Sequence, residues 1–564
     1  SSVVNVSMKE GNKERIKSSL SLGPLSSQFT IDGPLNKGKS TFMWSMRSAY
    51  LSLISLPSMY MYRYPGTGVN RYYNYYLYDM NAKFNHSFSP KQTLYLSFYA
   101  GRDVFLRKER WGGEETSSKF GWGNKTASAR FVATLSPRLF RETMVSVNTF
   151  DFNNSALISN QDTSINKAAD KSFSRGSGVF DASIRQRFEY TLSDKHKLTG
   201  GIELQRQSLT PDQYKLSENI LPAGYASERK NRYLFHTTAF YVEDFFSTQH
   251  LTLRSGIRMA VFYVGKTKYF SPEPRFNLEV PLSANSAITL AYSFMKQPIH
   301  LLSQPTQGIP IDVWVPVTEN MPPQQSHQIS AGYSHSFPQT PYKISLATYY
   351  KPSRYVIDYQ TGLDYAANLT GKWEDMIETN GLGKAYGLEL MIEKTSGRFN
   401  GWIAYTLARN QKKFANINND EWYDARYDRR HDLNIVASYQ ITPKWKVSST
   451  FTLYSGLTTT IPTAYMLDIY GNEIPVYTKR NNYRMPLYHR LDIAFTKDYV
   501  SKRGRKSSIS FGAFNAYGRA NPQYLSLNSS SINGSNYEYL GFINKYQTGT
   551  MFGFIPFFNY NVNF

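Results

Sequence analysis

One stretch of the sequence has the spacing of a phosphate-binding loop. Residues Gly33 to Ser40 read Gly-Pro-Leu-Asn-Lys-Gly-Lys-Ser, which fits the pattern G-x-x-x-x-G-K-S. That pattern binds phosphate when a helix follows it, because backbone N–H groups and the helix N-terminus then face the anion. Here residues 41–46 are rich in strand formers, and Pro34 has no N–H to donate. We therefore predict a hairpin turn at this position and no nucleotide site.

The residue types that usually carry catalysis are scattered along the chain. The nine histidines include no His-Glu-x-x-His pair, cysteine is absent, and Gly176-Ser177-Gly178 lacks the spacing of a nucleophile elbow. His431, between Arg430 and Asp432, is expected to pack at a strand end or to make an interior hydrogen bond. The sequence predicts no catalytic, cofactor or metal site and no enzyme. A hydrolase built into a barrel wall stays open as a minor alternative.

Tryptophans beside long polar connections are the better candidates for binding. Aromatic side chains on loops are common at ligand sites, since loops carry function and aromatic rings bury large apolar areas. The alternative is that they anchor the chain at a membrane interface or pack the loops. The candidate residues are Trp111, Trp122, Trp314 and Trp422.

The end of the chain indicates what kind of element must position these residues. From Phe558 onward, large apolar side chains alternate with Asn559, Asn561 and Asn563, and the chain ends on an aromatic residue. Alternation with period two is typical of a strand with one apolar and one polar face. A terminal aromatic strand resembles the C-terminal targeting signal of outer-membrane β-barrel proteins. The predicted assembly signal is Phe558, Tyr560, Val562 and Phe564, on a strand that pairs with the one near 15–22 and so removes a free edge.

The same alternation of apolar and polar residues recurs along the chain. Successive strands are joined by a short turn and a long connection in alternation. In 182–190, for example, apolar residues alternate with Ser183, Arg185, Arg187 and Glu189. Charges on one face suit a wet lumen better than lipid or a dry core. The pattern predicts an all-β fold, a transmembrane antiparallel barrel of about 22 strands. The expected long connections are Leu51–Tyr72, Asp103–Phe120, Ala156–Gly176, Pro211–Lys230, Leu302–Gln324, Tyr359–Lys384, Ala415–Arg426, Thr463–Met485 and Leu525–Thr548.

Composition narrows the partners. The 564 residues carry a formal net charge of +22 and include 44 tyrosines and 35 phenylalanines. No run of eighteen apolar residues exists, which excludes a transmembrane helix. A basic chain suggests an anionic partner, but the charges form no arm or patch, which argues against nucleic acid. Membrane lipid and lipopolysaccharide phosphate are the expected partners.

Several stretches resemble TonB-dependent outer-membrane receptors. Residues 239–246 and 251–258 look like the mid-barrel hairpin of that family, although Glu243 and Phe246 replace its usual Gln and Trp. The late-barrel run, in the form common in Bacteroidota, is matched by Ala385–Leu390, Gly401–Leu407 and Tyr427–Leu433, and the penultimate strand end by Asn515–Pro522. The resemblance covers nearly the whole chain and is weak for substrate.

The resemblance implies a division of the chain and a function. Residues 1–12 look like the C-terminal remnant of a plug domain, and 13–564 form the barrel in the bacterial outer membrane. The implied function is active import of a siderophore, cobalamin, glycan or peptide, energised by the inner-membrane TonB complex through a missing N-terminal segment. A surface lipoprotein lid is a further possible partner. The alternative is a scaffold subunit of a secretion or assembly complex.

The size of the barrel leads to one more expectation. A lumen of about 22 strands is too wide for side chains to fill, so residues 1–564 alone should form a large, weakly selective pore. Inward folding of a connection such as Leu302–Gln324 would instead supply a substitute plug, and would favour the scaffold class.

Overall fold

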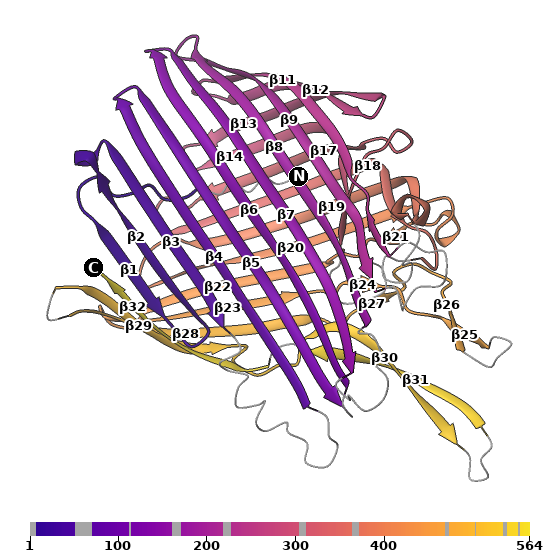
Figure 1. Cartoon of the computed structure of the whole chain (residues 1–564). Helices are drawn as coiled ribbons and strands as arrows, with labels where there is room; N and C mark the ends of the chain where they lie inside the picture. The colour runs from indigo at the N-terminus through magenta and orange to yellow at the C-terminus, as the bar shows by residue number, and fades with distance from the viewer. Residues whose placement is uncertain are drawn as a thin grey trace.

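A computed structural model describes residues 7–50, 70–111, 114–160, 171–217, 227–303, 312–363, 372–467, 473–501, 504–533, 539–550 and 553–564. In this part of the chain, 22 antiparallel strands form a closed barrel, and β10 and β21 add short pieces to its sheet (Figure 1). The predicted fold class is therefore confirmed.

The strands run in sequence order around the barrel. In its first half they are β1 (Lys17–Leu22), β2 (Ser26–Leu35), β3 (Ser40–Tyr50), β4 (Asn70–Ser89), β5 (Gln92–Trp111), β6 (Glu114–Ser136), β7 (Leu139–Asn160), β8 (Lys171–Thr191), β9 (His196–Leu216), β11 (Tyr233–Ser247) and β12 (Thr252–Val264). In its second half they are β13 (Thr267–Ser283), β14 (Ser286–Gln297), β17 (Gln324–Ser336), β18 (Tyr342–Tyr359), β19 (Ile377–Lys394), β20 (Phe399–Lys413), β22 (His431–Gln440), β23 (Trp445–Tyr454), β28 (Tyr488–Val500), β29 (Lys506–Phe514) and β32 (Ile555–Asn563).

The remaining elements lie in the connections. They are η1 (Asn36–Gly38), β10 (Glu228–Lys230), β15 (Ile299–Leu302), β16 (Val313–Pro316), η3 (Trp373–Met376), η4 (Asn418–Asp420), β21 (Tyr423–Asp424), β24 (Thr458–Thr459), β25 (Ala464–Leu467), β26 (Glu473–Val476), β27 (Tyr483–Arg484), β30 (Pro522–Asn533) and β31 (Tyr539–Thr550). Among the described residues, no helix is long and apolar enough to cross a membrane.

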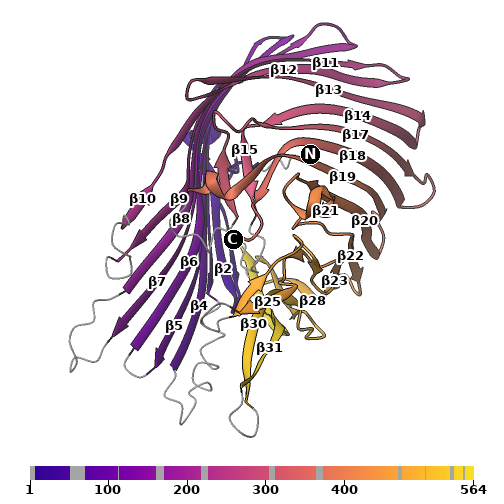
Figure 2. The same cartoon turned by 90° about the vertical axis from the view of Figure 1, so that its right-hand side faces the viewer.

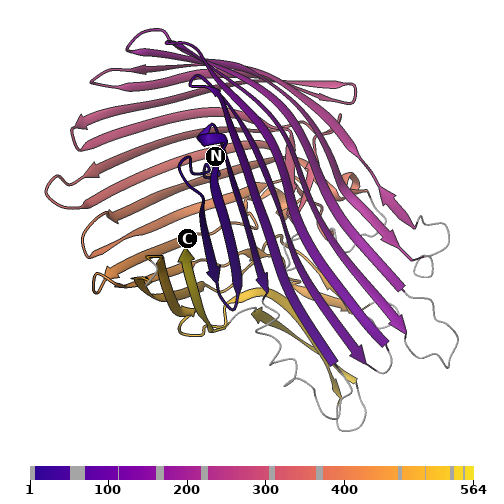
Figure 3. The same ribbon diagram turned by 60° about the vertical axis from the view of Figure 1, so that its left-hand side comes forward.

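The barrel closes where the terminal strand was expected to pair. β32 lies antiparallel to β1, with Leu20 opposite Val562 and Leu22 opposite Tyr560. The backbone N–H of Phe564 donates to the carbonyl of Ser18 at 2.8 Å, which extends the seam to the last residue. The first and last strands of the chain therefore lie side by side (Figure 3).

Alternation along the strands separates an apolar outside from a charged inside. On β8, Phe180, Ile184 and Phe188 are 36–51% exposed, as lipid-facing side chains of a barrel should be in the absence of lipid. The intervening Arg185 and Arg187 face inward, where Arg185 pairs with Glu203 at 2.8 Å. The predicted faces are thus observed, and by the outer-membrane arrangement the short turns are periplasmic and the long connections extracellular.

The turn at Gly33–Ser40 is a hairpin, as predicted. β2 ends at Leu35 and β3 begins at Ser40, with Lys37 and Gly38 between them at φ +54° and +82°. A strand follows the motif in place of the helix that phosphate binding requires. The nucleotide interpretation is therefore excluded by the geometry.

The prediction that Asp103–Phe120 forms a long connection is wrong. β5 continues to Trp111 and β6 starts at Glu114, so almost all of that range is paired strand. β4 to β9 are 20–23 residues long, about twice the length that spans a bilayer, and extend well beyond it (Figure 2). Gly and charged residues there suggested a loop, but ladder hydrogen bonds to both neighbouring strands hold the segment extended.

The first described residues lie in the lumen, against the inner face of the barrel wall. Lys9 Nζ is 3.0 Å from Asp32 Oδ1, and the backbone N–H of Asn12 donates to Asp32 Oδ2 at 2.9 Å. Lys83 Nζ donates to the carbonyl of Met8 at 2.9 Å. A segment held by lumenal side chains of β2 and β4 is where the tail of a plug would leave the lumen, so the division at residue 12 remains a prediction with a compatible geometry.

Candidate functional site at the extracellular mouth

The connection between β14 and β17 folds into the barrel. Its two strands, β15 and β16, pair as a hairpin in which Leu302 faces Val313. β16 contacts β8 and β9, whereas β15 contacts β18, so the hairpin lies inside the ring of strands (Figure 2). We call this element the lumenal hairpin; its tip, 304–311, is outside the described residues.

The lumenal hairpin enters over a low point of the rim. The extracellular turn between β12 and β13 is only Gly265 and Lys266. Glu319 covers this turn, since its Oε1 accepts a hydrogen bond from the backbone N–H of Lys266 at 2.8 Å. Tyr269 Oη donates to the carbonyl of Thr318 at 2.9 Å. These contacts fix the base of the hairpin on the rim.

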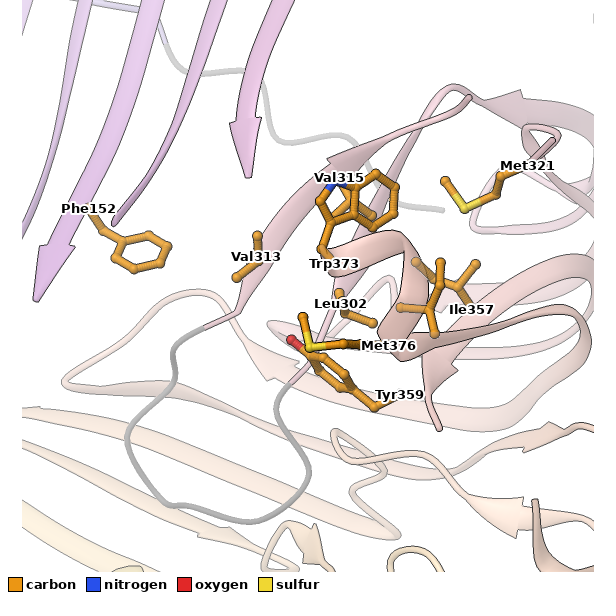
Figure 4. Packing of buried hydrophobic residues seen from close by; sticks show 10 residues of the cluster. Phe152, Leu302, Val313, Val315, Met321, Ile357, Tyr359, Trp373 and Met376 are labelled. Carbon is orange, nitrogen blue, oxygen red and sulfur yellow. The ribbon is translucent and has the colours of Figure 1, made fainter. Parts of the chain in front are cut away.

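An apolar cluster joins the hairpin to opposite parts of the wall. We call it the mouth cluster, and it consists of Phe152, Leu302, Val313, Val315, Met321, Ile357, Tyr359, Trp373, Met376 and Ile377. In Figure 4, Trp373 and Met376 lie beside Leu302 and Tyr359 at its centre. Its wall residues come from β7 on one side and from β18, η3 and β19 on the other. Eight strands of the ring separate β7 from β19, so the cluster crosses the lumen as a chord.

Two of the four predicted tryptophans belong to this structure. Trp122 packs against the mouth cluster with its ring centroid 5.2 Å from that of Phe120. Trp314 packs on the other side of the hairpin, against a second cluster that contains Leu209 and Phe235. Both rings therefore pack the hairpin against the wall, which is the packing alternative. Their role in binding a ligand remains a prediction.

The other two predicted tryptophans differ. Trp422 is 37% exposed, and Lys384 Nζ lies 4.0 Å from the centroid of its ring, a cation–π contact outside the mouth cluster. The side chain of Trp111 lies outside the described part of the structure. The residue that the sequence analysis missed is Trp373, which is fully buried at the centre of the cluster. It lies in the connection Tyr359–Lys384, so the criterion used for the other tryptophans would have found it.

One polar side chain of the hairpin is almost fully buried. His300 is 1% exposed, and neither ring nitrogen makes a hydrogen bond of good geometry among the described residues. Burial lowers the pKa of His300 to about 4, and Lys412 adds to the effect. The imidazole is therefore neutral at physiological pH.

A network of buried charges ties the outer connections together. Asp428, 1% exposed, accepts a hydrogen bond from the N–H of Asn410 and one from Arg484, both at 2.5 Å. Arg484 also reaches Asp424 at 3.1 Å, and Arg430 reaches Asp424 at 3.2 Å. Each carboxylate is thus shared by several guanidinium groups, which stabilises charges that burial would otherwise penalise.

The network continues to the end of β18, beside the mouth cluster. Lys412 Nζ lies 3.3 Å from Asp358, and Tyr423 Oη donates to the same carboxylate at 2.9 Å. Burial and the nearby Asp358 charge raise the pKa of Tyr423 far above its usual value. Arg480 donates to the carbonyls of Tyr359 and Gln360, each at 2.8 Å. These hydrogen bonds therefore hold the connection before β28 against the end of β18, at the base of the chord.

A stack of rings and guanidinium groups lines the wall next to this network. Tyr454 and Tyr488 lie opposite each other on inward-facing positions of β23 and β28, stacked 4.4 Å apart with 2° between their planes. The guanidinium carbon of Arg429 lies 3.8 Å from the centroid of the Tyr454 ring. Arg429 makes no ion pair with any carboxylate that the structure describes. It is a partly exposed cation held flat by an aromatic ring, which suits an anionic or planar ligand.

The described residues include no group of three or more His, Asp or Glu side chains that could hold a metal ion. His431, predicted to lie at a strand end, is the first residue of β22, and its Nδ1 shares a hydrogen bond with Tyr405 Oη at 2.8 Å on the outer face of the barrel. The strand-end placement is confirmed, and the interior hydrogen bond is not.

Comparison with known proteins supports the fold. No family model and no curated protein matches the chain. Among solved structures, the ferripyoverdine receptor of the outer membrane of Pseudomonas aeruginosa matches 99% of this chain and 72% of its own, with a TM-score of 0.63 and 11% identity. The ferric enterobactin receptor of the same organism matches 99% of this chain and 81% of its own, with a TM-score of 0.63 and 13% identity. The FrpB iron transporter from Neisseria meningitidis matches 97% of this chain and 81% of its own, with a TM-score of 0.60 and 10% identity.

These similarities place the chain among outer-membrane barrels and confirm the fold that the resemblance to TonB-dependent receptors implied. The Bacteroidota form of that resemblance is untested. At 10–13% identity, the similarity does not extend to a ligand.

Proposed function

We propose that this barrel imports a scarce nutrient across the outer membrane, with energy supplied by the inner-membrane TonB complex through a segment upstream of residue 7. The observation that carries the proposal is a closed 22-strand barrel with a charged lumen and an extracellular mouth of ordered side chains. Solved structures similar to it include receptors for ferripyoverdine and ferric enterobactin and a copper transporter.

The class of ligand that the mouth suits best is an anionic chelate or other planar anion. Arg429 offers a guanidinium that has no carboxylate partner among the described residues and is presented on Tyr454. Tyr488 continues the stack, and Arg490 Nη1 lies 3.4 Å from its hydroxyl. Ferric siderophores are the first members of this class to try, ahead of cobalamin, glycans and peptides.

A second candidate function is favoured by the lumenal hairpin. A barrel whose own connection crosses the lumen is partly closed without an upstream plug, as a scaffold subunit of a secretion or assembly complex could be. The mouth cluster buries Trp373, Met376 and Tyr359 completely, so the chord is a packed structure. Its presence also weakens the expectation that residues 1–564 form a freely open pore.

Conductance in planar bilayers tests the chord directly. Replacing residues 299–316 with a short Gly-Ser linker removes the hairpin and leaves the barrel strands intact. We expect the single-channel conductance of residues 1–564 to rise several-fold, because the chord crosses the lumen and obstructs it. A control variant with Trp422→Ala, outside the mouth cluster, should conduct like the parent. An unchanged conductance after removal of the hairpin would mean that the chord does not restrict the pore.

Uptake separates the two candidate functions. Cells that carry the full-length gene are given ⁵⁵Fe-labelled ferric siderophores, labelled cobalamin, glycans and peptides, with and without the inner-membrane coupling protein. If the protein is an importer, uptake of one ligand should require both the barrel and the coupling protein. Arg429→Ala should weaken uptake of that ligand by about tenfold, since it removes one charge-assisted contact. If uptake of every ligand requires neither the barrel nor the coupling protein, the result would favour the scaffold function.

A further inference from the structure

The mouth cluster divides the ring of strands into two unequal arcs. Eight strands, from β8 to β18, lie on one side of the cluster, and twelve strands, from β20 through the seam to β6, lie on the other. We call them the short arc and the long arc. Their inner faces differ in packing and in chemistry, and the difference indicates where a ligand can pass.

The inner face of the short arc is packed. Ala239 faces the inward Glu203 across the β9–β11 ladder. Ala260 in turn faces Ala239 and Ser271, so all three lie on the inward side of the wall. Inward side chains of β11, β12 and β13 that are at most 2% exposed include Thr237, Ala239, Ala260, Phe262, Ser271 and Glu273. A ligand therefore has no access to this part of the wall.

The inner face of the long arc borders the lumen instead. None of the residues of β22, β23 and β28 is buried, and the structure describes all three strands in full. Asn434 faces Thr452, and Thr450 faces Asp492, across the two ladders that join these strands. Because the inward side chains here keep contact with the lumen, the passage that the barrel leaves open runs along this side.

The short arc also carries a lattice of ion pairs. Arg185 lies 2.8 Å from Glu203, and Arg258 lies 3.2 Å from the same carboxylate. Glu273 is shared by Arg258 at 3.1 Å and Arg275 at 3.5 Å. The lattice joins β8, β9, β12 and β13, and its charges compensate one another. These groups are therefore engaged within the wall.

The long arc carries neutral hydrogen-bonding groups in place of such a lattice. Thr452 donates to the amide oxygen of Asn434 at 3.0 Å, between β23 and β22. The hydroxyl groups of Thr496 and Ser510 lie 3.0 Å apart, between β28 and β29. We call the inward hydroxyl and amide side chains of β22, β23, β28 and β29 the neutral wall.

The same chemistry continues across the seam. Ser21 of β1 faces Asn561 of β32, and the hydroxyl groups of Thr30 and Ser45 lie 2.9 Å apart between β2 and β3. Each hydroxyl or amide group both donates and accepts hydrogen bonds. A hydroxyl- or amide-bearing molecule that moves along these groups can therefore exchange one hydrogen bond for another, and no charge has to leave water.

The neutral wall begins at the ligand site proposed above. Tyr454, over which Arg429 lies, is the last residue of β23 and stands at its extracellular end. Thr450 lies four residues below it on the same inward face, opposite Asp492. Asp492 pairs with Arg490 at 2.9 Å, so the pair adds no net charge. A ligand that leaves Arg429 towards the periplasm would therefore meet neutral groups.

We propose that the path of the ligand runs along the neutral wall of the long arc, and that it takes a molecule with an uncharged body rich in hydroxyl or amide groups. An anionic group on the same molecule would engage Arg429 at the entrance. The inference rests on the proposed import function for the nature of the cargo. The path itself belongs to the barrel and is measurable without import.

Thiol modification in planar bilayers tests the path. The chain contains no cysteine, so a single introduced cysteine is the only target. Thr450→Cys and Ser510→Cys place it on the neutral wall, and Ala239→Cys and Ser271→Cys are the matched controls on the short arc. The anionic reagent 2-sulfonatoethyl methanethiosulfonate should reduce the current through the first two variants. It should react with them at least about tenfold faster than with the controls, because a buried thiol reacts only when the wall opens locally.

Block of the current by a neutral oligosaccharide tests the class of ligand. Maltohexaose added to the bath should block the channel formed by residues 1–564. T450V/T496V/S510A removes three hydroxyl groups from the neutral wall and should weaken the block about tenfold, as the loss of several hydrogen bonds predicts. T237V/S271A makes the same kind of change on the short arc and should leave the block unchanged. Heat-modifiable mobility on gels confirms that each variant has folded.

Two results would overturn the proposal. Equal modification rates on the two arcs, or a loss of current from the short-arc cysteines alone, would place the path elsewhere. Absence of block by maltohexaose, or equal block in the parent and T450V/T496V/S510A, would contradict the class of ligand. Neither bilayer measurement requires transport in cells, so a failure of the proposed import and a failure of this path are distinguishable.

Discussion

Basic residues have different partners on the inner wall and on the outer face of the barrel. On the inner wall, Arg258 lies between Glu203 at 3.2 Å and Glu273 at 3.1 Å, and Lys197 lies 2.5 Å from Glu189. On the outer face, Lys268 lies over the ring of Tyr263 and Lys296 donates to the carbonyl of Phe270, and neither forms an ion pair with a carboxylate of the described residues. The inner basic residues are thus held by ion pairs, whereas these two outer lysines are held by an aromatic ring and a backbone carbonyl.

This difference explains where a net charge of +22 matters. A lumen with paired charges presents a mixed surface, with local exceptions such as Arg429, and attracts no ion strongly over its whole length. On the outer face, lysines such as Lys268 and Lys296 carry charge without an ion pair among the described residues. Total charge alone does not distinguish the two cases, because it says nothing about which basic residues have partners.

The largest expected effect comes from breaking a buried pair on the inner wall. Glu273 is 2% exposed and is shared by Arg258, Arg275 and Ser271. Glu273→Ala should lower the free energy of unfolding by about 3–5 kcal/mol, because it leaves buried guanidinium charge without its partner. Urea unfolding of the barrel in detergent or vesicles measures the change.

The control for this prediction is Glu189→Ala on the same wall. The side chain of Glu189 is 21% exposed and pairs with Arg187 and Lys197, so its loss should cost only about 0–1 kcal/mol. Equal destabilisation by the two variants would mean that the lumen does not distinguish buried from solvated pairs.

A smaller effect is expected from a change of face on the closing strand. Val562 lies opposite Leu20 in the seam and is 7% exposed. Val562→Lys should destabilise the barrel by about 1–3 kcal/mol and lower the heat-modifiable fraction, because the charge enters the apolar outer face. Asn561→Ala removes one inward side-chain hydrogen bond, to Ser508 at 3.2 Å, and should do much less. Equal effects would reverse the assignment of the faces.

The smallest effect is expected on the outer face. Lys296→Gln should change the free energy of unfolding in detergent by less than about 0.5 kcal/mol, because the ammonium group forms no ion pair with a carboxylate of the described residues. Urea unfolding measures the change. A large loss of stability would show that the charge of Lys296 supports the barrel.

The sequence predicts the barrel well because its pattern is local. Period-two alternation identifies the inward Arg185 and Arg187 and the pairing of the last strand with β1. Turn residues likewise predict the hairpin at Gly33–Ser40. These features need only neighbouring residues and one ladder to form.

The contents of the lumen escape this reasoning. The pattern at 299–302 and 313–316 is that of any short hairpin, and nothing in it indicates that the hairpin folds inward. The inward position depends on Phe152 and Trp373, which are far away in the sequence and meet it only in the closed barrel. Strand ends are missed for a similar reason, since β5 continues through 103–111 by pairing with β4 and β6.

The central claim is that the lumen is the path of an energised import. The most direct test is accumulation of a ⁵⁵Fe-labelled ferric siderophore in cells that carry the full-length gene, compared with cells that lack the barrel or the inner-membrane coupling protein. The account predicts that accumulation falls at least tenfold in both deletions and is restored by the intact barrel. Accumulation that persists without the coupling protein, or that is absent with every labelled ligand offered, would contradict it.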